Sequence, residues 1–461
     1  ELDLSGCMSA DEIQMRLTKA VSLSAPNTWI TGRGWDHTLF NGGEWPTREI
    51  LDIASPNNPV FIRRVDGHIG WANSIALKMA NINSHSTTPK GGEILQDKTS
   101  GEPTGILKES AMTLISSIIP KTTKAEQMQA AELALKEAAR LGITSIQDNS
   151  DSTAFEIYNI LKKQGKLSVR VSEWLDLEMA SNPKLLERTI KNIQKHTIPN
   201  FIEIGLLKGF ADRTLGSRTA SFFEAYNDDQ ATSGLPQYSA DELQHLVQIA
   251  DSMGLQVGVH CIGDKANWMA LNAYKPKDHS TMERDARHRI EHAQVFRLQD
   301  IEKLVKYNVI ASMQPTHCTS DLRWAEKRIG HERSKGAYAW RRILDAGGKI
   351  AFGTDWPVEP LDPMRGLYSA VTRKNIESGK PAGGWFADQR ITIKEAIYCY
   401  TMGSAYAEFK EQNKGSITPG KLADIIILSN NILKAEPQDI LKTRVDMTIF
   451  DGKIIYQREE K

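Results

Sequence analysis

Residues 123–148 read TKAEQMQAAELALKEAARLGITSIQD, and this stretch decides the fold class. Thr123 and Glu126 form a capping box at the start of a helical pattern, and Gly142 ends that pattern. The apolar run ITSIQD, which follows at once, predicts a short buried strand. The stretch is therefore one helix-then-strand unit.

The same unit recurs along the chain up to residue 355. Three more helical patterns, at 239–253, 298–307 and 338–346, each end at a Gly or Asn and lead into an apolar run. Seven strands are expected, near 143–148, 168–174, 202–209, 255–261, 287–293, 309–315 and 350–355. Strands that alternate with helices predict a parallel sheet covered by helices, either a barrel or a doubly wound sheet.

Polar side chains at the strand ends separate these two folds. Each expected strand has one at or near its C-terminal end: Asp148, Glu173, Lys208, His260, His292, His317 and Asp355. Barrel enzymes draw their chemistry from the ends of many strands, whereas an open sheet uses one crevice, and no GxGxxG follows any strand here. We therefore expect an α/β protein with a (β/α)8 TIM-type barrel over residues 111–410, its first strand absent.

Both ends of the chain depart from this alternation. Residues 1–110 are rich in Trp, Gly, Pro and Asn, which predicts an inserted cap with loops. Residues 411–461 contain short β-rich runs separated by turn residues, with a hairpin turn expected at Asp451, Gly452 and Lys453. This last part is expected to belong to a small C-terminal β-sandwich.

Composition narrows the function classes. The 461 residues carry 57 Lys and Arg against 57 Asp and Glu, so neither nucleic acid nor an anionic membrane is an expected partner. The apolar runs fall far short of the roughly 20 residues that a membrane helix needs, which excludes a transmembrane segment. The four cysteines form neither a disulfide framework nor a CxxC pair, so any metal would be bound by His, Asp, Glu or Lys chemistry.

Residues 288–294, HRIEHAQ, pose the central question about function. On a strand, His288, Ile290 and His292 would share one face and Arg289 and Glu291 the other. A lone His at a strand end is more often a hydrogen-bonding residue than a metal ligand. The two His are four residues apart, as in HExxH, but that motif lies on a helix and its Glu occupies a different position.

Four ionisable side chains that lie in apolar runs favour a metal site more strongly than one His does. His260, His292, Asp355 and Lys208 would each cost several kcal/mol if buried without a partner. A shared divalent metal accounts for them together, and two imidazoles with a carboxylate suit zinc. For Lys208 two alternatives stay open: a buried amine that reacts with CO2 to give a bridging carbamate, or an ordinary pair with Asp212 or another carboxylate. Asp355 is the candidate general base, although an Asp in a turn is also common.

Other polar and aromatic residues are candidates for substrate binding. His68 and His317 end apolar runs and could orient a substrate or polarise its carbonyl. Trp71 could line a pocket, although aromatic residues near glycine-rich loops are as often ordinary packing residues.

Nine phrases of the chain together resemble the amidohydrolase superfamily, and more narrowly its YtcJ-like branch, which includes N-substituted formamide deformylases. They are GRGWD (32–36), PVFIRRVDGHIGWANSIAL (59–77), GEPTGILKESA (101–111), LLKGFADRTLGSRTA (206–220), VHCIGDKA (259–266), RHRIEHAQ (287–294), ASMQPTH (311–317), FGTDWPVEPLDP (352–363) and GSITPGKLADIIIL (415–428). One phrase alone would not be specific, but several together are.

The resemblance implies a metal site of one or two ions at the C-terminal mouth of the barrel. It implies Lys208 as a carboxylated bridge, His260 and His292 as ligands, and Asp355 as ligand and base. Arg218, in the matching phrase 206–220, joins His68, Trp71 and His317 as a substrate-binding candidate. The expected activity is hydrolysis of a carbon–nitrogen bond other than a peptide bond, in an amide- or formamide-like small molecule, by a metal-activated hydroxide.

One departure from the family pattern is serious, because no His-x-His pair occurs in these residues. Either the chain, which opens at Glu1, is part of a longer enzyme, or it has lost one metal half-site and is an inactive binding protein. A mononuclear deaminase or a cyclic-amide hydrolase is the alternative among enzymes, since one scaffold hosts all of these reactions. The cytoplasm is the default expectation for the compartment, with secretion or a periplasmic location as alternatives, and a homodimer is an open alternative for the assembly.

Overall fold

The computed structural model describes residues 1–276 and 284–459. The chain forms two compact units, Glu1–Thr123 and Lys124–Lys461. Each unit has buried hydrophobic clusters of its own, so each is described by itself. The boundaries that the sequence predicts near residues 110 and 410 stay predictions.

The first unit is a mixed sheet with short helices. Its strands are β1 (Leu2–Asp3), β2 (Ile30–Trp35), β3 (Val60–Arg64), β4 (Ile69–Ala72), β5 (Gly92–Gln96) and β6 (Pro103–Glu109), in the order β1-β2-β3-β4-β6-β5. Its helices are α1 (Ala10–Ser22), α2 (Arg48–Ala54), α3 (Ser74–Met79) and α4 (Thr113–Ser116). Strands β1, β2 and β3 are parallel, and the other neighbours pair antiparallel.

The expectation that this region lacks strand–helix alternation is wrong. Strand β1, helix α1, strand β2, helix α2 and strand β3 alternate, and the three strands are parallel. Helix α1 has a sequence signal, because Ser9 caps it and Ile13 and Leu17 form its buried face. Strand β2 reads ITGRGW, whose glycines weaken the strand pattern. The role of this unit as a cap stays a prediction.

The second unit contains a parallel sheet of seven strands, as the sequence predicts. They are β7 (Ser145–Asp148), β8 (Arg170–Asp176), β9 (Ile202–Phe210), β10 (Val257–His260), β11 (Arg289–Glu291), β12 (Ile310–Met313) and β13 (Lys349–Phe352). They lie side by side in the order of the sequence, with β7 and β13 at the edges. This order follows when each strand is linked to the next by a helical crossover.

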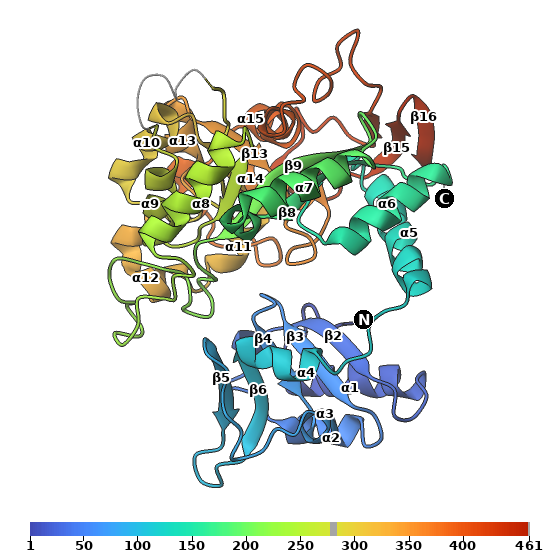
Figure 1. Cartoon of the computed structure of the whole chain (residues 1–461), viewed down its shortest axis with the longest axis vertical. Helices are drawn as coiled ribbons and strands as arrows, with labels where there is room; N and C mark the ends of the chain where they lie inside the picture. Colours follow the sequence, from blue (N-terminus) through green and yellow to red (C-terminus); the bar gives the residue numbers. More distant parts are fainter. Residues whose placement is uncertain (277–283, 460–461) are drawn as a thin grey trace. The chain divides into compact units, whose positions relative to one another are not determined.

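Helices follow the strands of this unit (Figure 1). They are α5 (Lys124–Arg140), α6 (Ser152–Lys163), α7 (Pro183–Gln194), α8 (Ala240–Ser252), α9 (Asp264–Ala273), α10 (Ile301–Lys306), α11 (Pro315–Asp321), α12 (Ala325–Ser334), α13 (Trp340–Asp345), α14 (Pro363–Thr372), α15 (Ile393–Tyr398), α16 (Ser404–Ala407) and α17 (Pro437–Ile440). The predicted capping pattern at Ser239 is a capping box in the structure, with Glu242 at its third helical position. Among the described residues, no helix combines the length and the apolar character needed to cross a membrane.

The parallel sheet is curled like part of a barrel. Arg289 on β11 donates a hydrogen bond to the side-chain oxygen of Gln147 on β7. In a flat sheet, four strand spacings of about 4.8 Å would separate these strands by roughly 19 Å, too far for such a bond. The fold is therefore TIM-barrel-like, whereas a closed barrel of eight strands stays a prediction.

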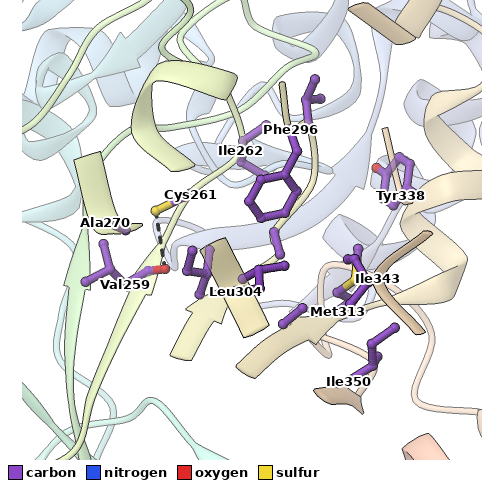
Figure 2. Close-up of a cluster of buried hydrophobic side chains, with 14 of the residues drawn as sticks. Val259, Cys261, Ile262, Ala270, Phe296, Leu304, Met313, Tyr338, Ile343 and Ile350 are labelled. Carbon is purple, nitrogen blue, oxygen red and sulfur yellow. Dashed lines mark hydrogen bonds between the residues drawn. The ribbon is translucent and has the colours of Figure 1, made fainter. Parts of the chain in front are cut away.

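One face of the sheet packs against helices and the other faces the interior of the curl. Figure 2 shows Val259, Met313 and Ile350 of β10, β12 and β13 among the side chains of the buried cluster, with Ala270 and Leu304 of helices α9 and α10. Successive side chains of a strand point to opposite faces, so His260 projects away from the face that Val259 uses. The core thus fixes which side chains line the interior.

The C-terminal strands β14 (Ile425–Leu428), β15 (Val445–Phe450) and β16 (Lys453–Gln457) form an antiparallel sheet. Asp451 and Gly452 have φ angles of 52° and 74°, the left-handed pair that a tight hairpin turn requires. The predicted hairpin turn at these residues is therefore confirmed. Their membership of a β-sandwich stays a prediction.

Candidate metal centre

Three side chains converge beyond the C-terminal ends of β11, β12 and β13. His292 directly follows β11, His317 lies on α11 after β12, and Asp355 follows β13. One possible ligand atom from each lies within 4.8 Å of the others. Because these strands are neighbours in a parallel sheet, their carboxyl ends meet at one edge. Among residues 1–276 and 284–459, this is the one such group of His, Cys, Asp or Glu side chains.

His260 and Lys208 lie beside this group. The ring centroids of His260 and His292 are 4.4 Å apart. The Lys208 ammonium lies 4.7 Å from the ring centroid of Phe210 and 5.8 Å from that of Trp174. It is close enough to Asp355 for their charges to interact. The structure thus gathers the four side chains that the sequence singles out as ligands, and their roles as ligands stay predictions.

His317 is the member of the group that sequence reasoning placed differently. The sequence predicts that it binds substrate, whereas its Nε2 lies 3.5 Å from Oδ2 of Asp355. It lies four residues after the end of β12, on α11, whereas His292 directly follows β11. Its predicted role in binding substrate stays a prediction.

The backbone conformation at His292 differs from the extended strand that the sequence predicts there. The strand ends at Glu291, and His292 has a φ of 70°, so it does not share a face with His288 and Ile290 by simple alternation. His288 has a separate role, because its Nδ1 accepts the backbone N–H of Val257 at 3.1 Å and its Nε2 lies 3.1 Å from Asp251. His288 therefore supports the β10–β11 pair, away from the candidate metal centre.

Asp212 is not the partner of Lys208. It is fully buried and accepts backbone N–H groups of Ser221, Ile262 and Gly263 at 2.8, 2.9 and 2.8 Å. Burial raises its pKa to about 7, although these three bonds oppose the shift. Among the described residues, Lys208 has no carboxylate within the 4.0 Å of a salt bridge. The predicted pair of Lys208 with Asp212 is thus not formed.

Burial and charge set the protonation of the group. Burial lowers the pKa of His292 to about 4, so this imidazole is neutral at pH 7. Burial also opposes a charge on His317, but the neighbouring Asp355 and Glu359 outweigh it and raise the pKa of His317 to about 9. Burial opposes the charge of Asp355 as well, yet His317, His292 and Lys208 hold the pKa of Asp355 below its ordinary value. Because the Asp355 side chain is 38% exposed, solvent screens part of this effect.

The donor atoms fit a divalent metal. Nε2 of His317 is buried and has no hydrogen-bond partner, since 3.5 Å to Asp355 is too long for a good bond. Two ligand atoms that each lie about 2.1 Å from an ion at a tetrahedral angle are themselves about 3.4 Å apart. Two imidazoles and a carboxylate in this arrangement are a common ligand set for such ions, and binding would displace the proton of His317.

The remaining candidates for substrate binding lie elsewhere in the chain. His68, in the first unit, has its Nδ1 3.0 Å from Glu109. Trp71 is fully buried in the core of that unit, where its indole N–H donates to the Thr47 carbonyl at 3.2 Å. Arg218, in the second unit, pairs with both carboxylate oxygens of Asp228 at 3.1 and 3.0 Å. Their roles in binding substrate stay predictions.

Known proteins share both the sequence and the fold. The chain is 32% identical to the putative amidohydrolase YtcJ of Bacillus subtilis, over 99% of this chain and 85% of that protein. It is 26% identical to an N-substituted formamide deformylase of Arthrobacter pascens, over 94% of this chain and 80% of the relative. A crystal structure of an uncharacterized metal-dependent hydrolase from Pyrococcus horikoshii matches with a TM-score of 0.73 and 31% identity, over 95% of this chain and 83% of that one. The sequence profile of the Amidohydrolase family matches residues 1–456, and the chain belongs to this family.

Proposed function

We propose that this member of a hydrolase family cleaves a carbon–nitrogen bond other than a peptide bond, in an amide- or formamide-like small molecule. One observation carries the proposal: the convergence of His292, His317 and Asp355, whose donor atoms lie within 4.8 Å of one another. The deformylase of Arthrobacter pascens, a relative at 26% identity, supports the substrate class. The proposed cofactor is a divalent metal, with zinc favoured by the ligand set.

His292, His317 and Asp355 would hold the ion, with His260 and Lys208 beside them. A bound divalent ion supplies Lewis-acid polarisation of the substrate carbonyl and makes a bound water more acidic. Lys208 has its pKa lowered by burial, against the charges of Glu291 and Asp355, so it fits either a neutral amine or a carboxylated form.

Asp355 is the proposed general base and acid. Its side chain is 38% exposed while that of His317 is 14% exposed, so the carboxylate is the member of this pair that solvent reaches more freely. Its pKa lies below the ordinary value of 3.8, so it is ionised at neutral pH and can accept the proton of the attacking water. The same carboxyl group then donates that proton to the leaving nitrogen, so the carbon–nitrogen bond breaks with release of a neutral amine.

A one-ion deaminase is the second candidate, and a cyclic-amide hydrolase on the same scaffold is a further alternative. The described residues supply one group of three ligand atoms. Nε2 of His260 is already hydrogen-bonded, because it lies 3.1 Å from the Arg213 carbonyl oxygen. Both observations favour one ion. The products separate these reactions, since a deaminase releases ammonia and a cyclic-amide hydrolase opens a ring.

Elemental analysis of protein purified without chelator tests the proposal. We expect at least one divalent ion per chain, its loss in His317→Ala, and its retention in His331→Ala, whose imidazole is exposed and paired with Glu326. Two ions per chain would support the amide hydrolase in a form that binds two metal ions, and one ion per chain would support the deaminase. The same protein should release amine from a panel of formamides, acylated amines and lactams. A protein with no bound ion and no turnover would overturn the proposal. That result would favour a barrel that binds a ligand without catalysing a reaction.

A further inference from the structure

Gln314 makes a contact with His292 that the proposed reaction does not use. Its side-chain Oε1 lies 2.8 Å from Nδ1 of His292, and both residues are 8% exposed. We propose that Gln314 is a positioning residue, which fixes the tautomer of His292 so that Nε2 presents its lone pair to the metal. This inference rests on the proposed function, because it assigns Gln314 a task at the same metal centre.

The strand pairing explains why these two residues meet. In the β11–β12 ladder Glu291 is opposite Ser312, and His292, one residue further, donates its backbone N–H to the Ser312 carbonyl at 2.8 Å. Gln314 lies two residues beyond Ser312 and keeps an extended backbone, with φ −122° and ψ 104°. Both side chains therefore leave the sheet at one place, beyond the last paired residues of neighbouring strands.

Hydrogen-bond chemistry gives this contact a direction. A neutral imidazole has one donor nitrogen and one acceptor nitrogen, and an amide oxygen can only accept. With Oε1 of Gln314 facing it, Nδ1 of His292 must carry the proton, which leaves Nε2 unprotonated. Among the described residues, Nε2 of His292 makes no hydrogen bond, so its lone pair is available. The opposite orientation of the amide would protonate Nε2 and block ligation.

Removing the acceptor should therefore weaken metal binding. Partners that hydrogen-bond to a ligating His typically contribute 10–100-fold to metal affinity. Gln314→Leu keeps the approximate size of the side chain and removes the acceptor. Gln314→Glu keeps an acceptor at the same place and should rescue binding. A residue that only fills space would tolerate Leu at least as well as Glu.

The matched control is another buried glutamine. Gln389 is 2% exposed and lies in the short 3₁₀ helix Ala387–Gln389, outside the candidate metal centre, where its Oε1 accepts the backbone N–H of Arg342 at 3.2 Å. Gln389→Leu removes an equally buried acceptor and should cost stability without changing the affinity for metal. This variant separates loss of a buried hydrogen bond from loss of the contact to His292.

Two measurements test the inference. Nitrogen NMR of histidine-labelled, metal-free protein should show His292 protonated at Nδ1 in the wild type and in Gln314→Glu, and a mixture of tautomers in Gln314→Leu. Titration with Zn²⁺ should give a dissociation constant about 10–100-fold higher for Gln314→Leu than for the wild type. A wild type protonated at Nε2, or equal zinc affinity in Gln314→Leu, would overturn the role of Gln314 while leaving the metal site intact. A wild type that binds no Zn²⁺ would overturn the proposed metal site and this inference together.

Discussion

Glu173 shows how strongly a position in the sheet can shift the pKa of a carboxyl group. It lies on β8 with 2% exposure, opposite Asp148 of β7, and Oγ of Ser150 donates to its Oε1 at 2.8 Å. Its other carboxylate oxygen is buried without a partner. Burial, with the neighbouring charge of Asp148, raises the pKa of Glu173 to about 8, although Ser150 opposes the shift.

Glu173→Gln should therefore change how stability depends on pH. Below pH 4.5, the ordinary pKa of a glutamate, Glu173 holds its proton in both the folded and the unfolded form. Between pH 4.5 and about 8 it holds the proton only in the folded form. The free energy of unfolding of the wild type should thus fall over this window, by up to about 5 kcal/mol at roughly 1.4 kcal/mol per pKa unit. Urea unfolding at pH 5 and pH 9 should find the variant near the wild type at pH 5 and more stable at pH 9.

The control for this prediction is Glu187→Gln, which changes an exposed carboxylate paired with Lys191. Its effect should be small and nearly equal at both values of pH. If Glu173→Gln shifted stability by the same amount at pH 5 and pH 9, Glu173 would be ionised throughout and the prediction would be wrong.

Asp355→Asn should remove the proposed proton transfer. A positioned acid–base group typically contributes 10²–10⁴-fold to a rate, so we expect kcat to fall by about that factor. Amine release measures it, and elemental analysis of the same sample reports whether the ion is retained. Asp345→Asn is the control, since that carboxylate is exposed and paired with Arg341. Activity of Asp355→Asn within a few-fold of the wild type would assign the transfer to another group.

Individual residues show which parts of the candidate metal centre can be predicted from the sequence. Lys208, His260, His292 and Asp355 are recognisable because each lies at or near the end of an apolar run, which places it at one rim of the sheet. The positive φ angles of His292 and Asp355, 70° and 58°, redirect the side chains after the strands end, and no spacing rule encodes that turn. His317 lies 3.5 Å from Asp355 and approaches it from helix α11, and its predicted role in binding substrate stays a prediction.

At the scale of elements, close backbone packing holds the loop after β9 against the start of α9. Gly263 precedes α9, and a Cβ placed on it would lie 2.0 Å from the Ser221 carbonyl oxygen. The same two segments both donate to Asp212, whose carboxylate lies 3.7 Å from His260. A glycine at this position lets the two backbones approach closely, and their contact fixes the surroundings of His260.

Gly263→Ala should therefore destabilise the protein. Overpacking typically costs about 1–3 kcal/mol, and here the obstacle is a backbone oxygen rather than a side chain that could move aside. Chemical unfolding gives the free-energy change, and metal content reports on His260. Gly383→Ala is the control, because a Cβ there meets nothing within 4 Å. If both alanine variants were equally stable, the close contact at Gly263 would carry no constraint.

Elements differ in how well the sequence predicts them. All seven parallel strands are found where expected, because each is an apolar run bounded by polar segments, and four of them follow a clear helix end at a residue such as Gly142 or Gly254. The alternation in the first unit is missed because β1 has two residues and β2 carries glycines and an arginine. A register shift between β8 and β9 just before Lys208 is likewise invisible to a period-two pattern.

At the scale of the whole chain, the resemblance to the amidohydrolase superfamily and its YtcJ-like branch is confirmed by relatives that align over nearly all of the sequence. The prediction of an enzyme, a hydrolase, is confirmed with it. Matches this long were predictable because the nine phrases lie in both units, from residue 32 to residue 428. The substrate was not predictable, since it depends on side chains that meet only in the folded protein.

Within the second unit, one buried ion pair joins the parallel sheet to the C-terminal sheet. Arg170 at the start of β8 binds both carboxylate oxygens of Asp424, at 2.6 and 2.8 Å, and the two side chains are 4% and 6% exposed. The guanidinium also donates to the Asn200 carbonyl at 2.7 Å. Its carbon lies 4.9 Å from the ring centroid of Phe450 on β15, so one side chain contacts both sheets.

Arg170→Met should loosen the C-terminal sheet, because it leaves the Asp424 carboxylate buried without its cation. Removing one partner of a buried pair typically costs about 3–5 kcal/mol, whereas replacing both partners with apolar residues costs much less. The double variant Arg170→Met/Asp424→Leu should therefore recover part of the loss. Amide hydrogen exchange should become faster in β14, β15 and β16 of Arg170→Met. The control is Lys442→Met, which breaks an exposed pair with Asp439 and should leave the exchange rates of these strands unchanged. Unchanged exchange in Arg170→Met would mean that apolar packing alone holds the two sheets together.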